Sequence, residues 1–212
     1  MSDDPYLDPE SGVLANLLAV ADPAALATAE VTIAAARTRQ LDQRPLPGDY
    51  DVAHLQAFHR HLFGDVYPWA GDFRTVNIAR STSFGDWRHI RTYLDQVFGD
   101  LARENYLAGL GREEFVRRLA HYFAEVNAAH PFREGNGRAQ RAFFRQLARD
   151  AGWSLRWVNV SADENAAASE ASLMATTVRS KRCWTARSSN DPAPEPLSVP
   201  VTEPMAGGLH EG

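Results

Sequence analysis

Residues 130–141 read His-Pro-Phe-Arg-Glu-Gly-Asn-Gly-Arg-Ala-Gln-Arg, and their polar side chains suit chemistry on a nucleotide phosphate. His130 can take a proton near neutral pH, and Glu134 can hold a magnesium ion. The glycines of the Gly-Asn-Gly turn let backbone N–H groups approach an anion, and Arg138 and Arg141 can clamp phosphate oxygens. We therefore interpret this stretch as an anion site that also carries a base and a carboxylate.

An amphipathic helix is predicted to start near Gly137, directly after the turn. The arginines of one helical stripe are Arg138, Arg141, Arg145 and Arg149. The opposite, apolar side holds Phe143, Phe144 and Leu147, which predicts the buried face. The simpler interpretation of Arg145 and Arg149 is a solvated surface, whereas Arg138 and Arg141 adjoin the turn and are candidates for binding phosphate.

The stretch resembles the signature of Fic-domain proteins, HxFx(D/E)GNGRxxR, and matches it at every fixed position. Residues 67–74, which read Tyr-Pro-Trp-Ala-Gly-Asp-Phe-Arg, are similar to the family's segment before its flap, and residues 6–16 are similar to its N-terminal stretch. The resemblance covers residues 6–175. It implies an all-α fold, a Fic-type helical bundle with one small β-hairpin, the flap, beside the active-site loop.

The resemblance also implies transfer of AMP from ATP to a hydroxyl side chain of a target protein. By this resemblance His130 would be the general base, Phe132 would anchor the loop in the core, and Glu134 would hold Mg²⁺ between the α- and β-phosphates. The expected ATP- and phosphate-binding residues are Arg133, Gly135, Asn136, Gly137, Arg138 and Arg141. Residues 135–137 would form the anion hole, the Asn136 side chain would orient the α-phosphate, and the last two arginines would hold the β- and γ-phosphates. Such displacement at phosphorus is catalysed mainly by positioning and charge stabilisation.

Residues 74–84 carry the one convincing short-strand pattern of the chain, in which apolar Val76 and Ile78 alternate with their neighbours and a Ser-Thr-Ser run supplies a turn. We expect a hairpin here that packs beside residues 130–141. An extended segment of the target could pair with its edge by strand addition. The expected docking residues are Thr75, Val76, Asn77, Ile78 and Ala79.

The chain has 212 residues, which suits one domain with a substantial core. We expect a single Fic domain over 1–187, with a short N-terminal extension, and a disordered Pro-rich tail over 188–212. Helices are predicted over 23–40, 51–63, 90–101, 115–126 and 162–180. Asp22 and Asp51 are the expected N-caps of the first two helices.

Composition excludes several classes of protein. Apolar residues make up 44% and charged residues 23%, as in globular proteins, and no apolar run is long enough for a membrane helix. The net charge of −5 argues against direct nucleic-acid binding. Cys183 is the single cysteine, which excludes an intrachain disulfide and a cysteine metal cluster. Because the N-terminus also shows no signal-peptide pattern, we expect the protein to be cytoplasmic. Lys181 is the only lysine, so neither a P-loop nor a protein-kinase site is present. If the protein uses ATP, arginines and backbone amides must hold its phosphates.

Other candidate residues have simpler interpretations. The histidines outside the motif form no metal-binding pattern and are interpreted as core or surface residues: His54, His59, His61, His89 and His121. Trp69 and Trp87 are interpreted as packing anchors beside the flap, with a place along the substrate groove as the alternative. Asn165 is interpreted as an ordinary helix residue, with an adenine contact as the alternative.

The complete motif favours an AMP-transferring enzyme over a catalytically silent Fic-like domain that only binds nucleotide or a partner. A third alternative is the same scaffold transferring UMP, phosphate or phosphocholine, or removing AMP, because the base is read outside the motif. The related Doc kinases alter the Gly-Asn-Gly turn, so the intact turn favours nucleotidyl transfer. The expected partner is a target protein with a Tyr, Ser or Thr hydroxyl.

Many Fic proteins carry an inhibitory helix that reads (S/T)xxxE(G/N). Outside the motif, glutamate precedes Gly or Asn only at Glu104, Glu164 and Glu211, and none of them follows a Ser or Thr at the required spacing. No internal inhibitor is visible. By similarity to Fic toxin–antitoxin pairs, we expect this chain to be a toxin and a separate small antitoxin to insert a glutamate opposite Arg141.

Overall fold

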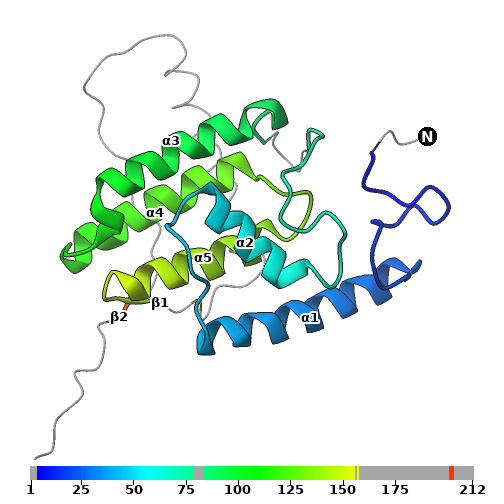
Figure 1. Ribbon diagram of the computed structural model, residues 1–212, viewed down its shortest axis with the longest axis horizontal. Coiled ribbons are helices and arrows are strands. Elements are labelled where there is room, and N and C mark those ends of the chain that lie inside the picture. Colours follow the sequence, from blue (N-terminus) through cyan, green and yellow to red (C-terminus); the bar gives the residue numbers. More distant parts are fainter. Residues whose placement is uncertain (1–3, 79–83, 156, 158–200, 203–212) are drawn as a thin grey trace, which may run out of the picture.

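The computed structural model describes residues 4–78, 84–155, 157 and 201–202, and its fold is all-α, as predicted (Figure 1). The helices are α1 (Pro23–Gln43), α2 (Val52–Phe63), η1 (Trp87–His89), α3 (Ile90–Arg103), η2 (Asn105–Leu107), α4 (Arg112–Ala129) and α5 (Asn136–Asp150), where η marks a short 3-10 helix. Every helix that the sequence predicts within the described residues is present. None of these helices has the length and apolar character of a membrane span.

Local sequence sets where the helices begin and end. The side chain of Asp22 accepts a hydrogen bond from the N–H of Ala25 at 2.8 Å, and that of Asp51 accepts one from the N–H of His54 at 2.8 Å. Both predicted N-caps are therefore confirmed. Helix α4 ends directly before His130, because the proline that follows disfavours helical backbone at the preceding residue.

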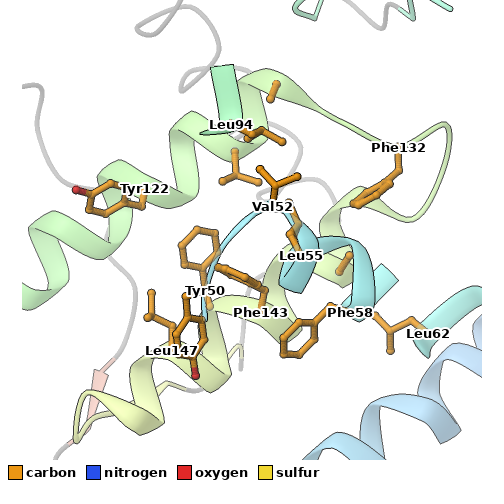
Figure 2. Packing of buried hydrophobic residues seen from close by; sticks show 14 of the residues in the cluster. Tyr50, Val52, Leu55, Phe58, Leu62, Leu94, Tyr122, Phe132, Phe143 and Leu147 are labelled. Atoms are coloured by element: carbon orange, nitrogen blue, oxygen red, sulfur yellow. The ribbon is translucent and has the colours of Figure 1, made fainter. Parts of the chain in front are cut away.

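Helix α5 lies at the centre of the bundle, in contact with α2 and α4, while α1 packs on α2 and α3 packs on α4 (Figure 1). Its predicted apolar face is confirmed, since Phe143, Phe144 and Leu147 are each at most 1% exposed. Figure 2 shows Phe143 near Tyr50 and Phe58, with ring centroids 5.5 and 5.7 Å away. Each such side chain contributes about 1.5–3 kcal/mol through burial, so the core holds α5 firmly.

The β-structure differs from the prediction. Strand β1 (Ser154–Leu155) pairs antiparallel with β2 (Val201–Thr202), so two residues of the tail predicted to be disordered form a strand. The rest of 188–212 and the predicted helix over 162–180 lie outside the described residues.

The described residues of the predicted flap form no strand. Residues 75–78 and 84–86 are loop, whereas 79–83 lie outside the described residues. Two backbone groups of this segment are bound by side chains: Arg74 donates to the Val76 carbonyl at 2.7 Å, and the Thr75 N–H donates to the hydroxyl of Tyr6 at 3.0 Å. The strand prediction for the described part of the flap is therefore wrong.

Candidate active site

His130 caps the C-terminus of α4 and opens the loop that leads into α5. Its backbone is left-handed, with φ 43° and ψ 62°, and its N–H donates to the Val126 carbonyl at 3.1 Å. This conformation costs a non-glycine residue about 1–2 kcal/mol, and it reverses the direction of the chain at the helix end. The imidazole stacks on Phe84, with ring centroids 3.8 Å apart. The helix end and an aromatic ring from the end of the flap therefore place the predicted base.

Gly135 makes the sharp turn of this loop, which we call the catalytic loop (residues 130–137). Its φ of 78° lies in the left-handed region, which glycine adopts without strain. A Cβ atom at this position would lie 2.4 Å from a ring carbon of Phe63, which is far inside van der Waals contact. The turn therefore requires glycine for conformational and steric reasons.

Two residues fix the inside of the catalytic loop. Phe132 is fully buried, as predicted for the anchor (Figure 2). The side chain of Asn136 accepts the Phe132 N–H and donates to the Phe132 carbonyl, both at 2.8 Å. The Asn136 amide is thus used within the loop, which does not support its predicted role at the α-phosphate. The first turn of α5, rather than the Asn136 amide, is the group that favours an anion here.

The two arginines of the motif lie in different surroundings. Arg138 forms an ion pair with Glu30 of α1, whereas Arg141 forms no ion pair with any residue that the structure describes. Burial, and then the charge of Arg138, lower the pKa of Arg141. An Arg141 guanidinium nitrogen lies 3.2 Å from where a Cβ of Gly137 would be, so the cation rests on the first turn of α5. A half-buried cation at a helix N-terminus favours an anion as its partner.

Glu134 has a carboxylate that a metal can reach. One of its oxygens accepts the N–H of Gly135 at 2.9 Å, and the side chain is 38% exposed. The part of the chain that the structure describes holds no group of three or more His, Cys, Asp or Glu side chains that could bind a metal. Because magnesium on a nucleotide takes most of its ligands from phosphate and water, one carboxylate fits a nucleotide-bound Mg²⁺.

Arg133 faces the N-terminal segment. Its Nε and one Nη lie 3.1 and 2.8 Å from the same oxygen of Asp4, and both side chains are largely buried. This pair fastens the N-terminal segment around Asp4 to the catalytic loop. The geometry does not support the prediction that Arg133 binds ATP, because its Nε and one Nη both donate to Asp4.

Arg74 joins the flap to the catalytic loop. Only 1% of this residue is exposed, and its guanidinium donates to the carbonyls of His130 at 2.9 Å, Val76 at 2.7 Å and Gly85 at 2.5 Å. A further carbonyl, that of Ala129 at the end of α4, lies at 3.3 Å, where the helix dipole favours a cation. In the sequence, Arg74 ends residues 67–74, the segment that resembles the Fic-domain segment before the flap, but no role was assigned to it.

The predicted docking residues divide into exposed Thr75 and Asn77 and half-buried Val76 and Ile78, while Ala79 lies outside the described residues. The Asn77 side chain accepts the N–H of Trp87 at 3.0 Å. Together with the bond from Thr75 to Tyr6, this contact ties the flap to its neighbours through side chains. Trp69 and Trp87 pack against the core, in agreement with their interpretation as anchors.

His59 is a site residue that the sequence did not identify. It is fully buried; its Nδ1 accepts the N–H of Gly71 at 2.8 Å, and its Nε2 donates to the carbonyl of Glu134 at 2.9 Å. The ring stacks on Phe132, with centroids 3.9 Å apart. Burial lowers the pKa of His59 to about 4, so the ring is neutral and supports the catalytic loop from beneath. Its place on the buried face of α2 is visible in the sequence, but its partner is 75 residues away.

The amino-acid sequence is similar to those of known proteins. The sequence model of the Fic/DOC family matches residues 49–148. The protein adenylyltransferase VbhT of Bartonella schoenbuchensis is 45% identical over 169 residues, which are 79% of this chain and 35% of that protein. The probable protein adenylyltransferase Fic of Salmonella typhimurium is 41% identical over 161 residues, which are 76% of this chain and 80% of that protein.

Solved structures show the same fold. BepC of Bartonella tribocorum, with bound AMPPNP, superposes with a TM-score of 0.74 at 27% identity, covering 79% of this chain and 88% of that one. The N-terminal Fic domain of a putative cell filamentation protein from Bartonella quintana, with bound ADP, has a TM-score of 0.74 at 27% identity, covering 81% of this chain and 87% of that one.

Proposed function

The chain belongs to the Fic/DOC family, and we propose that it is a protein adenylyltransferase that transfers AMP from ATP to a hydroxyl side chain of a target protein. Relatives from Salmonella typhimurium and Bartonella schoenbuchensis bear that activity in their names, and two structural neighbours hold AMPPNP or ADP. This chain spans 35% of the length of the Bartonella schoenbuchensis protein, so the proposal concerns the activity of the Fic domain.

Arg141 is the single observation that carries the proposal. Its side chain is half-buried, its guanidinium lies against the first turn of α5, and it forms no ion pair with a carboxylate among the described residues. Burying an uncompensated charge is costly, and the partial positive charge of the helix N-terminus adds to that cost. A polyphosphate would supply the missing negative charge beside His130, the one histidine of the catalytic loop.

In the proposed step, the target hydroxyl oxygen attacks the α-phosphorus of ATP while His130 accepts the hydroxyl proton. A new oxygen–phosphorus bond forms, the bond from the α-phosphorus to the bridging oxygen breaks, and pyrophosphate leaves. Arg138 and Arg141 would hold its β- and γ-phosphates, and the backbone of residues 135–137 would bind the α-phosphate. Glu134 would hold Mg²⁺, which neutralises phosphate charge when bound.

The proposal is tested by mass spectrometry of target proteins incubated with ATP, GTP, CTP or UTP and either wild type or His130→Ala. We expect one AMP per modified hydroxyl from ATP, and a rate about 10²–10⁴-fold lower for the variant. ATP affinity should change only a few-fold, because the base does not contact the triphosphate. The exposed His89→Ala variant serves as the control. Transfer of UMP or phosphate in place of AMP, or a wild-type rate for His130→Ala, would contradict the proposal.

The flap would dock the target by main-chain pairing, a proposal that the exposure of Thr75 and Asn77 supports. Asn77→Pro removes a backbone donor, and Asn77→Ala removes only the side chain that holds Trp87. We expect the proline variant to raise the KM for the target well above that of the alanine variant, with an unchanged KM for ATP. Equal target KM values for the two variants would argue against strand addition.

We further propose that the protein acts in the cytoplasm, where ATP is available, as the toxin of a toxin–antitoxin pair. The half-buried Arg141, which pairs with no carboxylate among the described residues, supports a partner that inserts a glutamate there. Expression of the wild-type chain alone should arrest growth, and expression of His130→Ala should not. Normal growth with abundant, active wild-type protein would overturn this role but would leave the enzymatic proposal intact.

A further inference from the structure

Glu30 and Arg138 form an ion pair between α1 and α5, 108 residues apart in sequence. Glu30 is only 6% exposed. One of its carboxylate oxygens accepts a hydrogen bond from the Arg138 guanidinium, and the other accepts one from the hydroxyl of Tyr67. Because each oxygen accepts a hydrogen bond from a different donor, the orientation of the Glu30 carboxylate is fixed.

The Arg138 guanidinium is held on three sides. It lies beside Glu30, 3.7 Å from a carboxylate oxygen of Glu134, and over the ring of Phe63 at 4.8 Å. Both carboxylates approach the same nitrogen, Nη2. A guanidinium carries five N–H donors in a rigid plane. When Nη2 of Arg138 is held by carboxylates, the directions of its remaining N–H donors are therefore fixed as well.

A second ion pair between the same two helices provides a contrast. Asp42 of α1 and Arg145 of α5 lie 2.8 Å apart, but their side chains are 43% and 45% exposed. Such surface pairs contribute little to stability. A buried pair is also weak evidence for stability, because removing both charges from water offsets their attraction. Stability alone therefore does not explain why a buried carboxylate faces a motif arginine.

We propose that Glu30 is a positioning residue for the transfer reaction and that it aims the free donors of Arg138 at the leaving pyrophosphate. The proposal rests on the proposed function, since it concerns the orientation of a phosphate-binding group. Without Glu30, Arg138 would still be charged and close to Glu134, but its long side chain would regain alternative rotamers. A misplacement of about 1 Å in a reacting arrangement can lower the rate about 10²-fold.

The charge of Glu30 and its hydrogen bond have opposite effects on catalysis, and two substitutions separate them. Glu30→Ala removes both, whereas Glu30→Gln removes the charge and keeps an acceptor for Arg138. Loss of a negative charge near the triphosphate should lower the KM for ATP in both variants. Loss of the hydrogen bond should lower kcat, by about 10-fold or more, in Glu30→Ala alone.

The kinetic experiment compares wild type, Glu30→Ala, Glu30→Gln and Asp42→Ala in AMP transfer at saturating target. Asp42→Ala is the matched control, since it removes the exposed carboxylate of α1 that pairs with α5 and should leave kcat and KM unchanged. A folded Glu30→Ala variant with wild-type or higher kcat would overturn the proposal. If Glu30→Ala does not fold, Tyr67→Phe replaces it, because it frees one oxygen of Glu30 while keeping the charge. Its kcat should then fall with an unchanged KM for ATP, and a wild-type kcat would overturn the proposal.

A spectroscopic measurement distinguishes failure of this inference from failure of the proposed function. In ¹⁵N NMR of arginine side chains, the wild-type protein should show slowly rotating Nη groups for Arg138, assigned by their absence from Arg138→Lys. Glu30→Ala should abolish these signals, and Asp42→Ala should retain them. If the signals persist in Glu30→Ala, Glu30 does not fix Arg138, whatever the enzyme transfers. If they are lost but wild type transfers no AMP, the proposed function fails and the positioning contact stands.

Discussion

His59 of α2 donates a hydrogen bond to the main-chain carbonyl of Glu134 at 2.9 Å. This bond holds the catalytic loop in place at Glu134. The other ring nitrogen of His59 accepts the N–H of Gly71 at 2.8 Å. This arrangement needs a neutral imidazole, because a protonated ring would have no acceptor for the Gly71 N–H. The shape of the catalytic loop is therefore coupled to the protonation of His59.

The first prediction concerns the dependence of stability on pH. The pKa of His59 falls from 6.5 to about 4 in the folded protein, so below pH 6.5 the unfolded chain binds the proton first. The free energy of unfolding should therefore fall as the pH drops from 6.5 to about 4, by roughly 3 kcal/mol from this group. Urea titrations across this range should show a shallower slope for His59→Gln, whereas exposed His89→Gln should keep the wild-type slope. An unchanged slope in His59→Gln would contradict the assignment.

Gly135→Ala should destabilise the protein, because the new Cβ meets the ring of Phe63 and the backbone is left-handed. The left-handed conformation costs about 1–2 kcal/mol, and overpacking adds about 1–3 kcal/mol. Gly99→Ala is the control, since it lies within α3 and its nearest neighbour would be 3.7 Å away. We expect that control to gain about 0.5–1 kcal/mol in urea unfolding. Equal stabilities of the two variants would show that the turn can relax.

Arg74→Lys should loosen the flap, because one ammonium group cannot reach carbonyls on both the flap and the catalytic loop. Each buried carbonyl left without a donor costs about 1–3 kcal/mol. Hydrogen exchange should therefore accelerate in residues 75–78 and 84–86, and the KM for the target should rise more than the KM for ATP. Arg88→Lys, at an exposed neighbouring arginine, provides the comparison. Wild-type exchange in Arg74→Lys would rule out the clamp.

Glu134→Gln should abolish the metal dependence of nucleotide binding, because an amide binds Mg²⁺ far less well than a carboxylate. Electron paramagnetic resonance of Mn²⁺ with AMPPNP would report the loss directly, without requiring transfer. The exposed Glu113→Gln variant should bind the Mn²⁺–nucleotide complex as wild type does. Full transfer activity of the wild-type protein in excess EDTA would argue that no divalent metal takes part.

The sequence by itself determined the helices and the chemical content of the catalytic loop. Asp22 and Asp51 cap their helices through neighbours a few residues away, and the apolar stripe of α5 follows from helical periodicity, so local patterns are sufficient there. Residues 130–141 hold the predicted base, the carboxylate, and Arg138 and Arg141 in one contiguous stretch, and such a stretch can be recognised without a structure.

Only the tertiary structure decided what each of these groups contacts. The Asn136 amide binds within the loop and Arg133 pairs with Asp4, although the sequence assigned both to ATP. Arg138 pairs with Glu30, a partner that the sequence did not identify. The reason is physical: a side chain's partner depends on which donors and acceptors the fold brings within hydrogen-bonding distance. Glu30 and Arg138 are 108 residues apart, so no local pattern encodes their contact, which forms because α1 and α5 both pack on α2.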